Sequence, residues 1–147
     1  MSARLTVSQV RERFDAALVA GGFTRSRFAP DSFGRDTDHL LPKSYSVSTP
    51  SSSIDAFDGR DNYRDEGEAT TRVEVRTAYR LRSDDQSGDY GLALDHEQAV
   101  IVAVMDGITG AKLHLRLDSV PDRSVSLDGA WLICRIRWTV HHRFAFV

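Results

Sequence analysis

The sequence is poor in several features that would narrow its class at once. It contains one cysteine, Cys134, in 147 residues, so neither an internal disulfide nor a cysteine zinc cluster can form. Its longest uncharged apolar run covers residues 99–105, which is far too short to cross a bilayer. The N-terminal residues show no apolar run followed by a cleavage site, so no export signal is expected. We therefore expect a soluble intracellular protein.

The chain also lacks a large excess of one charge, but its charges are unevenly distributed. A net charge of −2 excludes a strongly basic nucleic-acid-binding protein. Residues 31–68 hold nine carboxylates and four basic side chains, a sum of −5. Residues 112–147 hold six basic side chains and three acids, a sum of +3. This separation suits self-assembly, because opposite patches on neighbouring copies attract each other. Ordinary solvated faces would produce the same pattern.

The periodicity of apolar residues predicts an α+β fold that forms one domain over residues 1–147. The expected order is α-β-β-α-β-β, with two helices packed on one face of a mainly antiparallel sheet. The predicted elements are helices that start just after Thr6 and just after Asp89, and strands at about residues 38–48, 72–82, 113–117 and 132–146.

Local signals support the two predicted helices. Thr6 and Gln9 have the spacing of a capping box, and the glycine pair at 21–22 suits the end of the first helix. Asp89 is the expected cap of the second helix. Residues 99–105 are apolar nearly all round, so we expect this part of the second helix to be buried more deeply than the first helix.

A long acidic segment at about residues 49–69 is expected to be a loop. Its composition favours disorder in the isolated protein and ordering against a partner. The strand before it contains Pro42, which cannot donate a ladder hydrogen bond, so that strand should lie at a sheet edge.

The predicted core collects apolar positions from both helices and from the strands. We expect the following residues to be largely buried: Phe14, Leu18, Val75, Tyr79, Leu94, Ile101, Leu115, Ile136 and Trp138.

We find no pattern of residues that indicates catalysis or metal binding. Phosphate-binding glycine loops, nucleophile elbows and zinc-protease motifs do not occur. His96-Glu97 has no second histidine at zinc-ligand spacing and is interpreted as a solvated helix pair. His141 and His142 point to opposite faces of a strand and cannot chelate one metal ion. Cys134 is expected to be an inert core thiol. We therefore expect no enzymatic activity, no cofactor and no metal.

The basic residues of the two long strands fall on one side of each strand. If the strands share a sheet, these residues form an arginine-rich face opposite the helices: Arg72, Arg76, Arg80, Arg135, Arg137 and Arg143. Such a face can bind a phosphate backbone or an acidic protein surface. Protein contact is favoured, because the aromatic residues of these strands project to the other face and cannot stack on bases. A solvated face with cross-strand pairs between Glu74 and arginine is the plain alternative.

Three stretches of the chain resemble the tail terminator (tail completion) proteins of long-tailed bacteriophages. They are the acidic insertion before residues 72–76 (RVEVR), the helix start at 89–95 (DYGLALD) and the closing strand at 132–144. Together with the order of elements, the resemblance covers most of residues 5–147. It implies a hexameric ring that caps the tail tube, stops its growth and provides the head–tail joining surface. Tailocins and gene transfer agents contain similar proteins.

The resemblance also implies the partners and the location of the protein. These are further copies of itself, the tail-tube protein, head–tail connector or stopper proteins, and DNA passing through the ring lumen, with no membrane contact. The protein would be assembled in the host cytoplasm and become part of the virion neck.

Charge patterning, and not a family motif, selects the expected contact residues. Contacts between subunits or with the lumen are expected at Arg76, Arg80, Arg135 and Arg137. A partner-facing loop is expected to use Asp58, Asp61, Asp65 and Glu66. Two alternatives remain: a small nucleic-acid-binding or regulatory domain that uses the same arginines, and another component of the head–tail connection.

Overall fold

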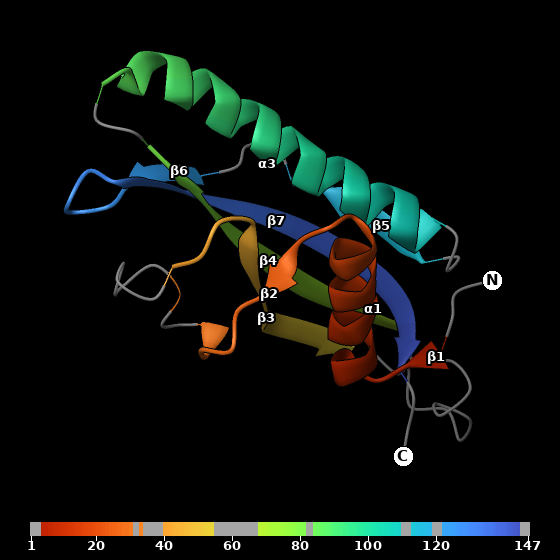
Figure 1. The fold of residues 1–147 in the computed structure, drawn as a ribbon. Coiled ribbons are helices and arrows are strands. Elements are labelled where there is room, and N and C mark those ends of the chain that lie inside the picture. The colour runs from red at the N-terminus through yellow and green to blue at the C-terminus, as the bar shows by residue number, and fades with distance from the viewer. Residues whose placement is uncertain are drawn as a thin grey trace, which may run out of the picture.

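The computed structural model describes residues 4–30, 33, 40–54, 68–81, 84–109, 113–118 and 122–144. Within these residues the chain forms two helices and seven strands of one sheet (Figure 1). The helices are α1 (Val7–Ala20) and α3 (Gln86–Thr109). The strands are β1 (Arg4–Leu5), β2 (Thr24–Arg25), β3 (Ser44–Ile54), β4 (Glu68–Arg80), β5 (His114–Leu117), β6 (Asp122–Val125) and β7 (Trp131–Phe144).

The sheet is built around the long antiparallel pair β4 and β7. Its strand order is β1-β7-β4-β3-β2, and β5 and β6 pair with β7 on the side away from β4. Only the two-residue strands β1 and β2 pair in parallel. The predicted α-β-β-α-β-β order is confirmed by α1, β3, β4, α3, β5 and β7. The three short strands β1, β2 and β6 were not predicted, because β1 and β2 have two residues each and β6 (DRSV) contains a single apolar residue, so none of them shows an alternating pattern.

The caps of α1 form as expected, whereas the cap of α3 differs. Thr6 and Gln9 make both hydrogen bonds of a capping box, at 3.1 and 2.9 Å. Gly22 adopts a φ of 90° just after the helix, a conformation that glycine accepts without strain. At the start of α3, the Asp85 carboxylate accepts a hydrogen bond from the Gly88 N–H at 3.1 Å. Asp89 lies inside the first turn, so the predicted cap was four residues late.

Both helices pack on the same face of the sheet around one main core (Figure 1). Five of the predicted core residues are fully buried: Phe14, Leu18, Val75, Ile136 and Trp138. The rings of Phe14 and Trp138 meet edge to face with centroids 6.1 Å apart. The other four are only half-buried, namely Tyr79, Leu94, Ile101 and Leu115. They lie near the margins of the helix–sheet contact, which periodicity alone does not locate.

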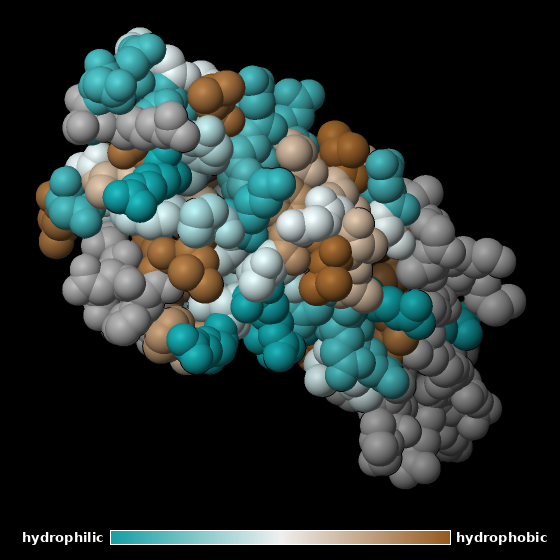
Figure 2. Space-filling view, viewed as in Figure 1, coloured by the Kyte–Doolittle hydropathy of each residue, from teal (hydrophilic) through white to brown (hydrophobic). Residues whose placement is uncertain are grey.

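The apolar second half of α3 is not buried more deeply than α1. Val102 and Met105 are 48% and 47% exposed, and Leu92 in the first half is 52% exposed. The helix packs through one side only, the side of Ala93, Val100 and Val104. The exposed apolar side chains on the face in view form separate brown groups divided by teal (Figure 2). α3 therefore lies at the surface with separate apolar side chains on its outer side.

Part of the expected loop at 49–69 is strand. β3 continues to Ile54 and β4 begins at Glu68, and the hydroxyls of Ser52 and Thr71 lie 3.1 Å apart across the pair. The register shifts between Ser48 and Ser51, so Pro50 sits where the ladder is interrupted. Residues 55–67, which hold the acidic part of the predicted loop, lie outside the described residues.

Candidate functional site

The predicted arginine-rich face exists on the side of the sheet that the helices leave uncovered. We call it the arginine face and define it by Arg72, Glu74, Arg76 and Arg80 of β4 and Arg135, Arg137 and Arg143 of β7. The register places Arg76 opposite Arg135 and Glu74 opposite Arg137. The sheet therefore brings together the four arginines that were expected to make contacts.

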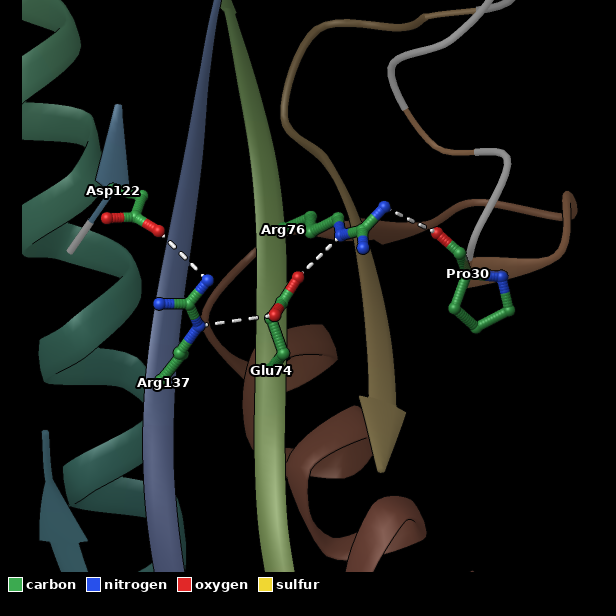
Figure 3. A network of polar contacts seen from close by, with 5 residues as sticks. All are labelled: Pro30, Glu74, Arg76, Asp122 and Arg137. Atoms are coloured by element: carbon green, nitrogen blue, oxygen red, sulfur yellow. Dashed lines mark hydrogen bonds and ion pairs between the residues drawn. The ribbon is translucent and has the colours of Figure 1, made fainter. Parts of the chain in front are cut away.

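A chain of polar contacts runs across this face through β4, β7 and β6 (Figure 3). The two oxygens of Glu74 accept from Arg76 Nε at 2.6 Å and from Arg137 Nε at 3.4 Å. Arg76 also donates to the Pro30 carbonyl at 3.2 Å, and Arg137 Nη2 lies 2.9 Å from Asp122 Oδ2. Two acids and two arginines thus compensate each other within the subunit.

The electrostatics of Glu74 show how strongly it is held in its charged form. Burial alone would raise the pKa of its carboxyl group, but the hydrogen bonds and charges of Arg76 and Arg137 outweigh that effect. The net result is a pKa below its ordinary value. The hydrogen bond to Glu74 likewise raises the pKa of Arg137. Glu74 is therefore the central anion of the network.

The four expected contact arginines are not equivalent. The side chain of Arg76 is only 17% exposed and is fully engaged by Glu74 and Pro30. Arg137 is 46% exposed and bridges Glu74 to Asp122. Arg80 and Arg135 are exposed, as is Arg72, and none of these three forms an ion pair with another described residue. Among the described residues of this face, the most exposed positive charges without an ion-pair partner are therefore those of Arg72, Arg80 and Arg135.

The four acids expected on the partner-facing loop cannot be placed on this surface. Asp58, Asp61, Asp65 and Glu66 lie outside the described residues. They therefore stay a prediction from charge patterning.

A second polar cluster lies between α3 and the sheet, where the sequence predicted a solvated pair. Glu97 is 4% exposed and forms a two-point ion pair with Arg123 of β6, with both N–O distances at 2.8 Å. Burial and the neighbouring Glu97 raise the pKa of the Cys134 thiol to about 12, which agrees with an inert cysteine. The missed signal was position: Glu97 lies four residues after Ala93 and three before Val100, on the buried side of α3.

The two other histidine predictions are resolved by their contacts. His142 is buried and lies on the helix side of β7, whereas His141 points to the opposite face. His142 Nδ1 lies 3.2 Å from the Arg143 carbonyl, which can only accept, so Nδ1 carries the proton. Nε2 then accepts from the Thr71 hydroxyl at 2.8 Å. His142 is thus a satisfied core histidine.

A cavity of about 760 Å³ opens at one end of the sheet. It lies where β4 ends at Arg80, where β3 begins after Lys43, and beside His96 on α3. No sequence motif predicts this cavity, because its wall is assembled from four separate segments of the chain.

Neither helix in the described part of the chain is long and apolar enough to cross a membrane. The same residues contain no group of three His, Cys, Asp or Glu side chains placed to hold a metal ion. Comparisons of this chain with models of known protein families and with curated proteins find no match.

Proposed function

We propose that the protein is a structural component of a phage virion that forms a ring on the tail tube. The ring stops tube growth and provides the surface that joins the tail to the head. The proposal combines the resemblance in residues 72–76, 89–95 and 132–144 with one structural observation. That observation is the arginine face, which presents Arg72, Arg80 and Arg135 outward from a long two-strand platform.

The arginine face suits contact between copies arranged head to tail. Such a contact needs two different and complementary surfaces on each subunit. The exposed arginines supply positive charge, and residues 31–68 of the same chain carry a sum of −5. The internal network of Glu74, Arg76 and Arg137 holds the platform without using the exposed arginines. Charge complementarity would then set the register and rate of assembly.

Termination would be steric in this proposal. A ring docked on the last ring of tube protein covers the growing end of the tube. Its outer side differs from a tube surface, so further tube subunits have no matching face to pair with. No chemical step is required.

Nucleic-acid binding through the same arginines is the second candidate. The exposed Arg72, Arg80 and Arg135 favour it, since arginine binds phosphate well. The aromatic side chains disfavour it: Tyr79 and Trp138 face the helices, and Trp131, on the arginine face, is 6% exposed within a small apolar cluster. No described aromatic ring on this face is open for base stacking. Protein contact is therefore the better supported function.

Tube assembly in the presence of the protein tests the proposal. We expect tubes polymerised with the wild-type protein to stop at a defined length and to join heads, and tubes made without it to grow overlong. Arg135→Glu should restore overlong tubes, because it reverses an exposed charge that has no partner among the described residues. Arg13→Glu makes the same change on the outer side of α1 and serves as the matched control.

Arg137 is unsuitable for this test. A carboxylate in its place would face both Glu74 and Asp122, so assembly could fail through loss of the fold. Tubes of normal length that join heads without the protein would contradict the termination role. Binding of Arg135→Glu to arbitrary DNA that is weaker and less salt-dependent than wild type would favour the nucleic-acid alternative.

A further inference from the structure

The cavity beside Arg80 has the size and position of a ligand site. Its volume of about 760 Å³ falls within the usual range for sites of small molecules. The turn at Asp128–Ala130, between β6 and β7, forms part of the wall. The cavity lies beyond the arginine network of Glu74 and Arg137, and neither residue lines it.

The inner wall of the cavity is apolar and aromatic. Ala78 and Leu81 contribute aliphatic surface, and the rings of Tyr79 and His96 contact each other with centroids 5.5 Å apart. Phe23 packs against the His96 ring at 5.4 Å. Burial, and then the charge of Lys43, lower the pKa of His96, so its ring is neutral at pH 7. This wall suits an apolar or planar group.

The rim of the cavity is cationic. Lys43 and Arg80 are both exposed, and neither forms an ion pair with another described residue. Asp128 is the one acid among the described lining residues, and its Oδ1 already accepts from the Ala130 N–H at 3.0 Å. The described lining residues therefore carry two positive charges against the one negative charge of Asp128, a net charge of +1 that favours an anion.

Two unusual features coincide at this place. Lys43 has a φ of 59°, a left-handed conformation that is strained for a residue with a Cβ. Its carbonyl accepts from the Thr24 N–H at 2.9 Å, which helps to hold the residue there. His96 Nε2 is buried without a hydrogen-bond partner among the described residues. Strained backbone and unsatisfied polar atoms concentrate at binding sites.

We propose that this cavity binds a small organic anion, with a carboxylate or phosphate between Lys43 and Arg80 and an apolar or aromatic body against Tyr79, His96 and Leu81. The site shares Arg80 with the arginine face, whereas Lys43 and the aromatic wall lie outside that face. Neither the charged rim nor the aromatic wall alone defines it, so a ligand must carry both kinds of group.

Titration of the full-length protein with phenyl phosphate tests the site, with inorganic phosphate and phenol as probes for its two halves. We expect saturable binding of phenyl phosphate, and at least tenfold weaker binding of inorganic phosphate and of phenol. Lys43→Met and Arg80→Met should each weaken phenyl phosphate binding by about tenfold, the loss expected for one charged contact. Arg116→Met, an exposed change on β5, is the control. Thermal unfolding confirms that each variant is folded.

The anionic group could belong to a free molecule or to an acidic peptide, and one added probe separates these sources. A peptide of residues 55–68 carries six acidic side chains together with Phe57 and Tyr63. In the intact subunit that segment is tethered at Ile54 and Glu68, at the opposite end of β4. β4 has 13 residues and spans about 40 Å, whereas a chain that leaves and returns within residues 55–67 reaches about 20 Å. A subunit therefore cannot fill its own cavity with this segment.

Competition between the peptide and phenyl phosphate would support the site and identify a peptide of another copy as the source. Binding of phenyl phosphate alone would support the site and identify a free small molecule. If phenyl phosphate fails to bind, or if Lys43→Met and Arg80→Met bind it as tightly as wild type, the proposal is overturned. Lys43 lies outside the arginine face, so normal tube termination by Lys43→Met would leave the ring proposal standing even if phenyl phosphate binding is lost, and the two proposals can fail separately.

Discussion

Glu97 of α3 and Arg123 of β6 join the long helix to an edge strand of the sheet through two parallel N–O contacts of 2.8 Å. The Glu97 side chain is 6% exposed and that of Arg123 is 35% exposed. The hydrogen bond to Glu97 raises the pKa of Arg123. The pair is asymmetric, because Glu97 is the buried partner and depends on Arg123 for compensation.

Removal of the arginine should therefore destabilise the protein more than neutralisation of the acid. We expect Arg123→Ala to lower the free energy of unfolding by about 3 kcal/mol, the low end for breaking a buried pair, because Arg123 is itself partly exposed. Glu97→Gln should cost less, since it leaves no buried charge. Urea unfolding of both variants measures the difference. Equal losses, or a larger loss for Glu97→Gln, would contradict this account.

The contact between the two helices depends on the absence of a side chain at Gly107. A Cβ at this position would overlap with Ala17 of α1, whereas a Cβ at Gly91 of the same helix meets nothing within 4 Å. Gly107→Ala should lower the free energy of unfolding by about 1–3 kcal/mol through overpacking. Gly91→Ala should raise it by about 0.5–1 kcal/mol, because alanine favours the helix. We expect the melting temperature to fall in Gly107→Ala and to rise in Gly91→Ala. Shifts of the same sign would contradict the close contact between Gly107 and Ala17.

Trp138 is the largest fully buried side chain of the core, and it packs against Phe14. Trp138→Ala should reduce the free energy of unfolding by about 3–5 kcal/mol, the range for deletion of a large buried aromatic residue. Thermal or urea unfolding checks the change. A variant that melts within a degree or two of wild type would show that this residue does not form the core.

One buried and one half-buried histidine should make stability fall as the pH is lowered. Burial lowers the pKa of both His142 and His96 below the ordinary value of 6.5. The unfolded chain then binds more protons than the folded chain once the pH falls below about 6.5. The stabilisation that comes from the neutral histidines is fully present above that pH. It is lost as the pH falls from about 6.5 through the lower pKa values of the folded state.

Unfolding by urea between pH 8 and pH 5 measures this dependence. His142→Gln should reduce the slope and leave the part that comes from His96. Glu74 does not affect the slope in this range, because its pKa is below the ordinary 4.5 and its stabilising effect is lost only when the pH falls further. An unchanged slope in His142→Gln would rule out a contribution from His142.

The fold could be predicted from the sequence because its long elements have clear periods. Residues 73–79 and 132–140 alternate along the paired strands β4 and β7, and the capping box at Thr6 defines the start of α1. Burial along α3 was harder to predict. An apolar run such as residues 99–105 does not show which side of the helix packs against the sheet. Val102 and Met105 stay exposed for that reason.

The candidate site was only partly predictable. Alternation in β4 and β7 placed the arginines on one face and left cross-strand pairs of Glu74 with arginine as an alternative, but it did not identify Arg76 and Arg137 as the partners. That pairing depends on the register of two strands about 60 residues apart in the chain. The cavity at Lys43 and His96 depends on four separate segments, and the left-handed Lys43 has no signal in the sequence.

The mass of the protein in solution with tail-tube protein present tests the central proposal most directly. One chain has a mass of 16.4 kDa. We predict a closed ring on the tube end. The complex should exceed the mass of the tube alone by a whole number of chains, and the resemblance implies that this number is six. Arg135→Glu should reduce that assembly, and Arg13→Glu should leave it intact. A wild-type protein that stays at 16.4 kDa with tubes present would contradict the proposed ring.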